Sequence, residues 1–348
     1  MSNRVTIADV ARQAGVSPMT VSRVINHKGD VSASTRQRVL AVVEELGYRP
    51  SSIARGLATQ RTGALGLVVP DVANPFFSDL VHGVEHGAYA RGYNVFLCNS
   101  EEDPQRELEI LDLLEEKQVE GLVLCSSRLD AQALQVLVAR QPKVVLVNRR
   151  LADPTVRSVV VDDERGGYLA TRHLLDIGCR AVGLLAGPHP SRSGRLRAQG
   201  YRAALAEFQV KTREGWTRSC RPDVEGGLNA ARDLLAQQPE LDGLICFNDL
   251  VAVGALQACA ERGLAVPEEL AIVGYDDIAL AALVTPSLTT CRVPRFELGR
   301  QAVRLLLEQL EGSTDAGEDI VLQPELIIRQ SAPSTICHAN RPTAVEEP

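Results

Sequence analysis

The stretch VTIADVARQAGVSPMTVSRVIN, residues 5–26, decides the fold of the N-terminal part of the chain. Thr6 is placed to cap a helix, and an acidic residue follows it at the three-residue spacing of a capping box. Gly15 can supply the positive φ that ends such a helix, and Ser17 followed by Pro18 is typical of the start of the next one. Two short helices joined by a turn that contains glycine predict a helix-turn-helix.

The second predicted helix has an apolar face and a polar face. Val21, Val24 and Ile25 recur at helical spacing, so we expect them to point inward. The opposite face fits the major groove of DNA, where the first residues of a helix meet base edges. We expect base contacts from Pro18, Met19 and Arg23, and phosphate contacts from Thr20, Ser22 and Asn26. The same pattern also fits a small helical bundle whose polar face is solvated.

The residues that follow predict a third helix and then a short fourth one. Ser32 can cap the third helix, and Gly47 can end it. The side chains expected to close a three-helix core are Val39, Leu40, Val43 and Leu46. The segment YRPSSIARGLATQRTG, residues 48–63, allows a helix of about two turns, shorter than the roughly 12–15 residues that an isolated helix needs in water. We therefore expect this helix to form on DNA, with Leu57 inserted between base steps of the minor groove.

Charge is distributed unevenly along the chain. The 348 residues carry a net charge of −7, which taken alone argues against binding to nucleic acid. The first 60 residues, however, hold eight arginines and lysines against four aspartates and glutamates. A basic head on an acidic body is the asymmetry expected when one module alone contacts phosphate.

Composition and terminal sequence indicate the class of protein. Apolar residues make up 45% of the chain, enough for a buried core, and the length predicts two or three domains. The start MSNRVTIADV has no secretory signal, and no run approaches the roughly 18 apolar residues of a membrane span, so we expect a cytoplasmic protein. The eight cysteines are scattered without a CxxC pair, so we expect reduced and mostly buried thiols.

Beyond Ala64, short apolar runs alternate with helical segments. The strand candidates are ALGLVVP, YNVFLCNS, GLVLCSS and KVVLVNR, followed later by AVGLLAGP, DGLICFN and LAIVGYD. Helical stretches near residues 76–91, 104–118 and 130–140 separate the first four. This alternation predicts parallel sheets with helices on both faces, and its occurrence twice predicts two α/β subdomains. The cleft between two such subdomains is a common ligand site.

Polar side chains follow these strands at the ends where ligands bind in such folds. They include Asp71, Asn148, Arg149, Arg150, Asp162, Asp163, Arg192, Arg195, Arg197, Asn248, Asp249, Asp276 and Asp277. Asp163, Asn248 and Asp249 also precede helices, so each can equally be a helix cap. Arg197 and Asp276 do not fit that explanation, which favours a hydrogen-bonding cleft.

The motifs TIADVARQAGVS, TVSRVIN and STRQRVLAVVEELGYRP resemble the lactose/galactose repressor family of bacterial regulators, and the resemblance extends to about Pro333. It implies a three-helix DNA-binding head and a periplasmic-binding-protein-like α/β effector domain. The implied divisions are 1–50 for the head, 51–62 for hinge helix and linker, 63–333 for effector binding and dimerisation, and 334–348 for a disordered tail. The implied subdomains are about 63–162 plus 292–320, and 163–291 plus 321–333.

The resemblance also implies an effector pocket between the subdomains. The residues to which it points are Asn74, Phe76, Phe77, Arg149, Arg197, Asn248 and Asp276. Carboxylate and amide acceptors beside an arginine donor suit the hydroxyl groups of a sugar or sugar derivative. Pro222 stands where several family members carry an aromatic platform, and Phe76 or Phe77 could substitute for that platform. An arginine-rich cleft also suits a sugar acid or a phosphorylated ligand.

These features together predict a transcriptional repressor whose operator affinity is controlled allosterically by a sugar-like effector. The tail carries no leucine heptads, so we do not expect the tetramer-forming coiled coil that is known in one branch of the family it resembles. We therefore expect a homodimer on a pseudo-palindromic operator, with one half-site for each protomer. The alternative is a solute-binding protein for a sugar-type ligand without a DNA role. No catalytic motif or cofactor fingerprint is found, so we expect neither an enzyme nor a cofactor. His82 and His86 lie four residues apart without a third ligand nearby, so we expect no metal site.

Overall fold

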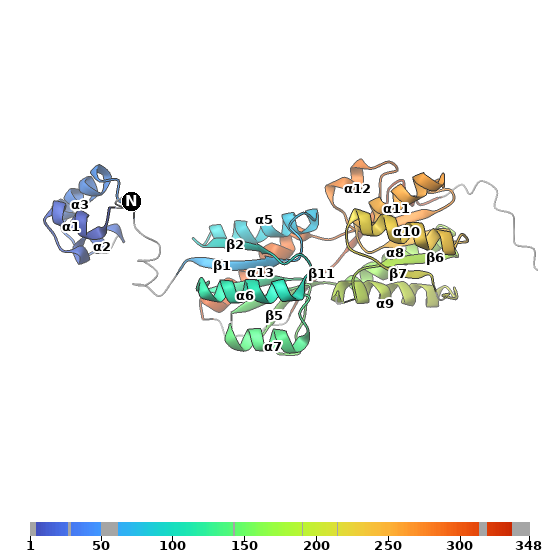
Figure 1. Ribbon diagram of the computed structural model, residues 1–348, viewed down its shortest axis with the longest axis horizontal. Coiled ribbons are helices and arrows are strands. Elements are labelled where there is room, and N and C mark those ends of the chain that lie inside the picture. The colour runs from blue at the N-terminus through green and yellow to red at the C-terminus, as the bar shows by residue number, and fades with distance from the viewer. Residues whose placement is uncertain are drawn as a thin grey trace, which may run out of the picture. The chain divides into compact units, whose positions relative to one another are not determined.

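The structure, a computed structural model, describes residues 5–26, 29–49, 62–141, 143–189, 191–213, 215–312 and 319–335. The chain separates into two compact units, residues 1–63 and 64–348. Figure 1 shows the helical head and the two α/β subdomains of the larger unit. The expected hinge helix with Leu57 lies outside the described residues, as does most of the expected tail.

Three helices form the head: α1 (Ile7–Ala14), α2 (Pro18–Ile25) and α3 (Ala33–Glu45). The backbone N–H of Thr6 donates to Asp9 Oδ2 at 3.0 Å, and the backbone N–H of Asp9 donates to Thr6 Oγ1 at 3.4 Å. Gly15 ends α1 with a φ of 64°, and Ser17 caps α2 by accepting from the N–H of Thr20. The predicted capping box, turn and second helix are therefore confirmed.

The core of the head consists of small and β-branched side chains. The buried members are Val10, Ala11, Ala14, Val21, Val24, Val39 and Val42. The prediction for α3 was wrong at one position, because Leu40 is 46% exposed and Val42 points inward in its place. Successive helix residues are about 100° apart, so an inward Val39 brings Val42 to the same side and turns Leu40 to solvent.

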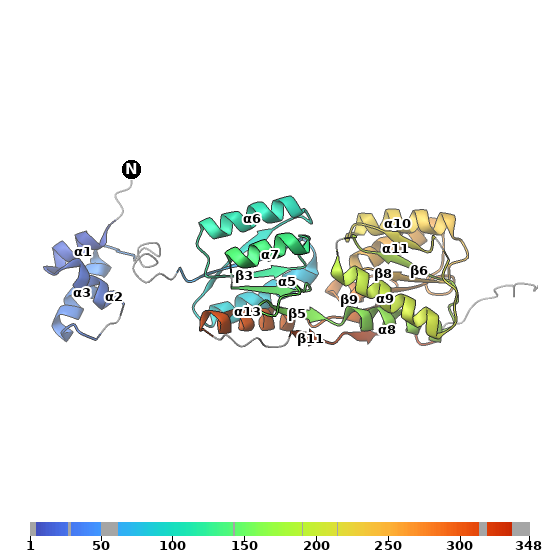
Figure 2. The ribbon, with the colours of Figure 1, turned by 90° about the horizontal axis from the view of Figure 1, so that it is seen from below.

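The first α/β subdomain has a parallel six-stranded sheet in the order β11-β5-β4-β3-β1-β2. Its strands are β1 (Ala64–Val69), β2 (Asn94–Asn99), β3 (Gly121–Cys125), β4 (Val144–Val147), β5 (Arg157–Val161) and β11 (Ile320–Leu322). Its helices are α5 (Pro75–Tyr89), α6 (Pro104–Glu116), α7 (Ala131–Arg140) and α13 (Arg295–Leu310). Figure 2 shows α6 and α7 on one face of this sheet and α5 and α13 on the other.

The two faces of this sheet bury alternate residues of the same strand. Leu65 and Leu67 of β1 join a core with α5 and α13, whereas Ala64 and Val68 join a separate core with α6 and α7. Because both faces are covered, the strand is apolar throughout, as parallel strands typically are. The predicted layer arrangement is therefore confirmed.

The second subdomain repeats this plan with a sheet in the order β12-β10-β9-β8-β6-β7. Its strands are β6 (Val182–Ala186), β7 (Thr217–Ser219), β8 (Gly243–Cys246), β9 (Ala271–Asp276), β10 (Thr289–Arg292) and β12 (Glu325–Ile327). Only β12 runs antiparallel to its neighbour among the paired strands of this sheet that the structure describes. Its helices are α8 (Asp163–Asp176), α9 (Arg192–Glu207), α10 (Val224–Gln237), α11 (Asp249–Arg262) and α12 (Ala279–Leu283).

The described chain passes between the subdomains at three places. These crossings lie between β5 and α8, between β10 and α13, and between β11 and β12. Each subdomain is consequently assembled from segments that are far apart in sequence. The cleft between the two subdomains lies beside these crossings.

Helices α5 and α13 pack so closely that their backbones touch. A Cβ atom on Gly83 of α5 would lie 2.1 Å from the backbone oxygen of Phe296 in α13, so no larger residue fits there. Gly299 of α13 makes the reciprocal approach to the backbone oxygen of Leu80 at 2.1 Å. The two helices therefore pack tightly against each other on one face of the first sheet.

Candidate functional site

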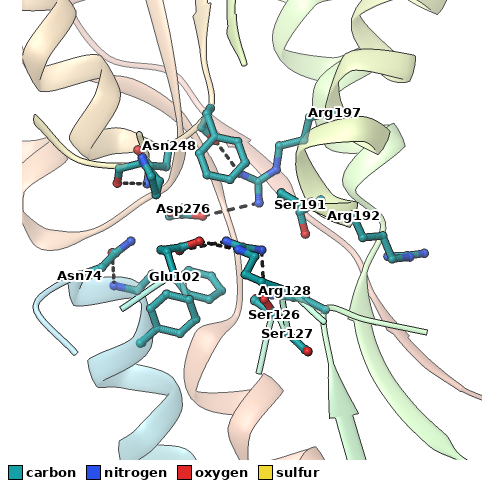
Figure 3. A pocket seen from close by; sticks show the side chains of 16 residues that line it. Asn74, Glu102, Ser126, Ser127, Arg128, Ser191, Arg192, Arg197, Asn248 and Asp276 are labelled. Atoms are coloured by element: carbon teal, nitrogen blue, oxygen red, sulfur yellow. Dashed lines mark hydrogen bonds and ion pairs between the residues drawn. The ribbon is translucent and has the colours of Figure 1, made fainter. Parts of the chain in front are cut away.

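A pocket lies between the two subdomains, at the carboxyl ends of their strands (Figure 3). The first subdomain contributes Asn74, Phe76, Phe77, Glu102, Ser126, Ser127, Arg128 and Asn148. The second contributes Ser191, Arg192, Ser193, Arg197, Pro222, Phe247, Asn248 and Asp276. Ligands of open α/β sheets bind at such strand ends, so this pocket is the candidate site.

Arg197 is the central cation on the second-subdomain side. Its Nε donates to Asp163 Oδ1 at 2.9 Å, and its Nη1 donates to the backbone oxygen of Phe247. Its guanidinium carbon also lies 3.5 Å from the centre of the Tyr275 ring. Burial opposes the charged form, but the negative charges of Asp163 and Asp276 outweigh burial and raise the pKa of Arg197. Arg197 is thus a fixed, permanently charged donor.

Close contact between α8 and α9 sets the position of Arg197. A Cβ atom on Gly167 of α8 would lie 2.2 Å from the backbone oxygen of Arg197 in α9. Only glycine permits this approach, which brings the Arg197 side chain within reach of Asp163 at the start of α8. The local sequence therefore fixes one wall of the pocket.

Asp276 ends strand β9 with its carboxylate turned into the pocket (Figure 3). It has a φ of 107°, and it is 4% exposed. Its Oδ1 lies 3.9 Å from Arg197 Nη2. Burial raises the pKa of Asp276 to about 7, although Arg197 and Arg295 favour the ionised form. This carboxylate therefore titrates near neutrality, and in its ionised form it can accept hydrogen bonds from hydroxyl groups.

Asn248 is both a helix cap and a pocket residue. Its Oδ1 accepts from the backbone N–H of Val251 at 2.9 Å, which caps α11. Its Nδ2 donates to the backbone oxygen of Pro222 at 3.0 Å. The amide thereby joins two segments of the pocket wall.

The other two residues for which capping was considered have different roles. Asp162, not Asp163, caps α8, because its Oδ1 accepts from the N–H of Arg165 at 3.1 Å. Asp249 is fully buried, and it accepts from Thr290 Oγ1 at 2.6 Å and from the N–H of Ile278 at 2.8 Å. Burial raises the pKa of Asp249. It holds the segments around β9 together and does not line the pocket.

The first subdomain supplies apolar surface from the start of α5. Asn74 caps this helix by accepting from the N–H of Phe76 at 3.0 Å. The rings of Phe76 and Phe77 meet edge to face, with their centres 5.0 Å apart. These rings offer the apolar faces on which a sugar ring can lie. Phe247, which was not predicted from the sequence, adds a third ring from the second subdomain.

An ion pair between Glu102 and Arg128 also lines the pocket, and neither residue was predicted from the sequence. Arg128 Nη2 donates to Glu102 Oε1 at 2.9 Å, and Arg128 Nη1 donates to the backbone oxygen of Ser126 at 3.0 Å. The second contact of the bidentate pair joins Arg128 Nε and Glu102 Oε2. Both residues lie just beyond strand ends, in the loops after β2 and β3, and that position was the signal that could have revealed them.

The structure brings together six of the seven pocket residues that the resemblance implied. Arg149 is the exception, because it is not among the lining residues and its Nη2 donates to the backbone oxygen of Leu129 at 2.8 Å. Its neighbour Asn148 lines the pocket instead. Asn148 has a φ of 54°, so the chain turns sharply at the end of β4 and carries Arg149 away.

The expected DNA-contacting residues lie on the outer face of α2. Pro18, Met19, Arg23 and Asn26 are exposed, with Met19 at 65%, whereas Thr20 and Ser22 are partly buried. The hydroxyls of Ser17 and Thr20 lie 3.0 Å apart, and Asn26 Nδ2 donates to the backbone oxygen of Ser22 at 2.9 Å. This face is thus free of the head's own core.

Metal binding and membrane insertion were the other possibilities considered for the described residues. Among the described residues, no group of three or more His, Cys, Asp and Glu side chains is arranged to hold a metal ion. His82 and His86 instead pack against Phe296, with ring centres 5.2 and 5.9 Å away. None of the described helices combines the length and the apolar character needed to span a bilayer.

Comparison with known proteins matches both parts of the chain to one family. Residues 62–330 match the family described as periplasmic binding proteins and sugar binding domain of LacI family, and residues 6–51 match bacterial regulatory proteins, lacI family. An HTH-type transcriptional repressor PurR from Haemophilus influenzae (strain PittEE) is 36% identical over 338 residues, covering 95% of this chain and 99% of the relative.

Two solved structures share the fold over nearly the whole chain. The Lac repressor dimer bound to operator and the anti-inducer ONPF has a TM-score of 0.86 and 29% identity, and it covers 95% of this chain and 100% of its own. The complex of the transcriptional regulator CelR with cellobiose has a TM-score of 0.72 and 31% identity, with coverages of 94% and 100%. The chain therefore belongs to the LacI family, as a DNA-binding repressor with a periplasmic-binding-protein-like effector domain.

Proposed function

We propose that the pocket binds a neutral polyhydroxyl effector, a sugar or sugar derivative, which controls the affinity of the head for operator DNA. The observation that carries this proposal is the pairing of charges in the pocket. Arg197 contacts Asp163 and faces Asp276, and Arg128 is paired with Glu102. Arg192 points away from the centre of the pocket (Figure 3).

This pairing favours hydroxyl groups over anions. An anionic ligand that pairs with Arg197 or Arg128 would have to displace a carboxylate from that arginine, which leaves the carboxylate buried and without its partner. A hydroxyl can instead donate to a carboxylate and accept from a neighbouring guanidinium at the same time. Because Arg197 and Arg128 are already paired, they do not favour a sugar acid or a phosphorylated ligand.

Further polar groups in the pocket also suit a polyol. Asn148 Oδ1 is buried and has no hydrogen-bond partner among the described residues, so it is an acceptor available to a hydroxyl. Four serine hydroxyls, each able to donate and accept, line the same pocket: Ser126, Ser127, Ser191 and Ser193. The related regulator CelR, solved with cellobiose, supports the same ligand class.

The proposal extends to the head and its contacts with DNA. Pro18, Met19 and Arg23 are proposed to meet base edges, and Thr20, Ser22 and Asn26 to meet phosphates. A homodimer would place two heads on a pseudo-palindromic operator, in keeping with the related Lac repressor dimer bound to operator. The wedge role of Leu57, in the proposed hinge of residues 51–62, rests on the sequence alone.

The alternative of a sugar-binding protein without a DNA role does not account for the head. Its exposed α2 face and its basic composition have no use in a protein that only captures solutes. Shifts in DNA mobility separate the two, because a solute-binding protein retards no DNA fragment. A double-stranded fragment selected from a random pool serves as the probe.

Thermal unfolding against a ligand panel tests the effector class. The panel comprises neutral sugars, sugar acids, sugar phosphates, nucleosides and purines, each added to the full chain. A ligand at a hundred times its dissociation constant adds about 2.7 kcal/mol of stability, which is readily measured. Neutral sugars are expected to raise the midpoint temperature of unfolding and to change the retardation of DNA by the protein. Tighter binding of the acids, or of purines alone, would contradict the proposal.

A further inference from the structure

The cleft continues past the effector pocket into a larger outer cavity. The outer cavity has a volume of about 640 Å³, compared with about 40 Å³ for the inner pocket. The inner pocket is thus the narrow part of the cleft, and the outer cavity is its wide part.

The wall shared by the two cavities consists of three residues, Glu102, Arg128 and Pro222. Glu102 and Arg128 come from the first subdomain, and Pro222 comes from the second. The ion pair is made of side chains on the loops after β2 and β3. Moving the ion pair or separating the two subdomains slightly would therefore join the two cavities into one continuous site.

The lining of the outer cavity has a definite chemistry. Carboxylates outnumber guanidinium groups, with Asp71, Glu101, Glu102 and Asp223 against Arg128 and Arg221. None of the described residues that line it is aromatic, so a nucleobase finds no ring on which to stack. Both guanidinium groups already pair with carboxylates, Arg128 with Glu102 and Arg221 with Asp223, so an anionic group meets no unpaired cation among the described residues of this lining. Carboxylates accept hydrogen bonds from hydroxyls. The occupant that fits is an uncharged, hydroxyl-bearing unit.

We propose that the effector is a disaccharide or a comparable glycoside that spans both cavities. One ring lies in the inner pocket among Phe76, Phe77 and Asp276, and the second ring lies in the outer cavity. The linkage between the rings passes the constriction between Pro222 and the Glu102–Arg128 pair. This inference rests on the proposed function, because it takes the inner pocket as the effector site.

The test obstructs the outer cavity and leaves the inner pocket intact. Ser219 is exposed at the end of β7 and lines the outer cavity, so Ser219→Trp fills part of it. Glu101→Trp obstructs the same cavity from the first subdomain, at a side chain that is 59% exposed. Thr217→Trp is the matched control, because Thr217 is exposed on the same strand and does not line the outer cavity.

Titration calorimetry of the full chain uses glucose, galactose and ribose against cellobiose, maltose, lactose and melibiose. We expect at least one disaccharide to bind more tightly than its constituent monosaccharides. Ser219→Trp and Glu101→Trp should each lower the affinity for that disaccharide by about tenfold or more, equivalent to about 1.4 kcal/mol. Monosaccharide affinity should be unchanged in both variants, and Thr217→Trp should leave both kinds of ligand unaffected.

The outcomes separate this inference from the proposed function. If monosaccharides bind as tightly as disaccharides and neither obstruction matters, the two-cavity inference is overturned while the effector role of the inner pocket stands. Binding of purines or nucleosides alone overturns the inference and the sugar class together, but leaves effector control intact. Binding of no compound from either panel overturns both.

Discussion

The guanidinium of Arg295 donates a hydrogen bond to the backbone oxygen of Asp276, so a helix of the first subdomain holds a pocket residue of the second. The same guanidinium forms an ion pair with Asp79 of α5 at 2.8 Å. Arg295 is the first residue of α13, directly after one of the chain crossings. A change at Asp276 on effector binding can therefore reach α5 and α13 through one side chain.

Replacing Arg295 by alanine should weaken communication between effector and DNA more than it weakens either binding event. Coupling energies of this kind are about 1–3 kcal/mol, or about 5- to 150-fold in affinity. We expect effector affinity at pH 8.5 to change little, while the effect of ligand on operator affinity shrinks towards none. Calorimetry and DNA retardation with and without effector measure the two quantities. Arg300→Ala is the control, because Arg300 pairs only with Glu297 of its own helix in the described contacts.

Replacing Arg197 by alanine should abolish effector binding and destabilise the effector domain. The substitution leaves Asp163 buried without its ion-pair partner and Asp276 with Arg295 as its remaining nearby cation, and breaking a buried pair in this way costs about 3–5 kcal/mol. Denaturant unfolding measures the loss, and DNA retardation at low temperature should show that the head still binds. Arg202→Ala, at an exposed position of the same helix α9, is the matched control. Retained effector response in Arg197→Ala would remove Arg197 from the site.

Effector affinity should fall as the pH is lowered through about 7. The pKa of Asp276 is raised to about 7 by burial, so acidification below that value protonates the carboxylate. A protonated carboxyl has fewer acceptor sites for ligand hydroxyls than a carboxylate has. Because the hydroxyls bind the ionised form more tightly, ligand affinity should be higher at high pH. Calorimetry from pH 5.5 to 8.5 should show this decline in the natural chain. Asp276→Asn should bind more weakly throughout and show no such decline.

Asp276 should also make the free protein less stable as pH rises. Its pKa is about 7 in the folded state against 3.8 for an ordinary aspartate, so between those values the folded chain retains a proton that the unfolded chain has released. Stability falls with pH wherever the folded state binds more protons. Urea unfolding from pH 4 to pH 8 should show a smaller fall for Asp276→Asn than for the natural chain. Parallel curves for the two proteins would refute a raised pKa.

Replacing Arg23 by alanine should lower operator affinity and relax specificity. A bidentate arginine–guanine pair contributes about 1–3 kcal/mol of discrimination against the wrong base. We expect a loss of that size on the selected operator and a smaller loss on unrelated DNA, measured at one salt concentration. Arg12→Ala removes the same charge from α1, where Arg12 pairs with Asp9 at 3.2 Å. Equal losses in both variants would mean that Arg23 contributes charge only.

Much of this fold follows from local patterns in the sequence. The capping box at Thr6, the turn at Gly15 and the strand beginning at Ala64 are each indicated by residues that lie close together in the sequence. The short strands β7, β11 and β12 have no such signal, because each has three residues and is defined by its neighbour in the sheet. Their pairing depends on distant segments, which periodicity does not report.

The pocket was predictable only in part, for a related reason. The rule that ligands lie at strand ends led to Asn248, two residues beyond the end of β8, and to Asp276, the last residue of β9. It did not separate Asn148 from Arg149, because the backbone turn at Asn148 decides which side chain enters the pocket. It also missed Arg128, whose place depends on its pairing with Glu102, which is 26 residues away.

The three chain crossings also order the events of synthesis. The first sheet gains its supporting helix α13 and its edge strand β11 only after residues 295–322 have been made. At 5–20 residues per second, roughly 150 residues after β5 take on the order of 10–30 s to emerge. The second sheet, which lacks only β12 by residue 292, can form first. On the ribosome, the second subdomain should therefore fold before the first. Strands β1 to β5 should remain without their covering helix α13 until residues 295–322 have been made.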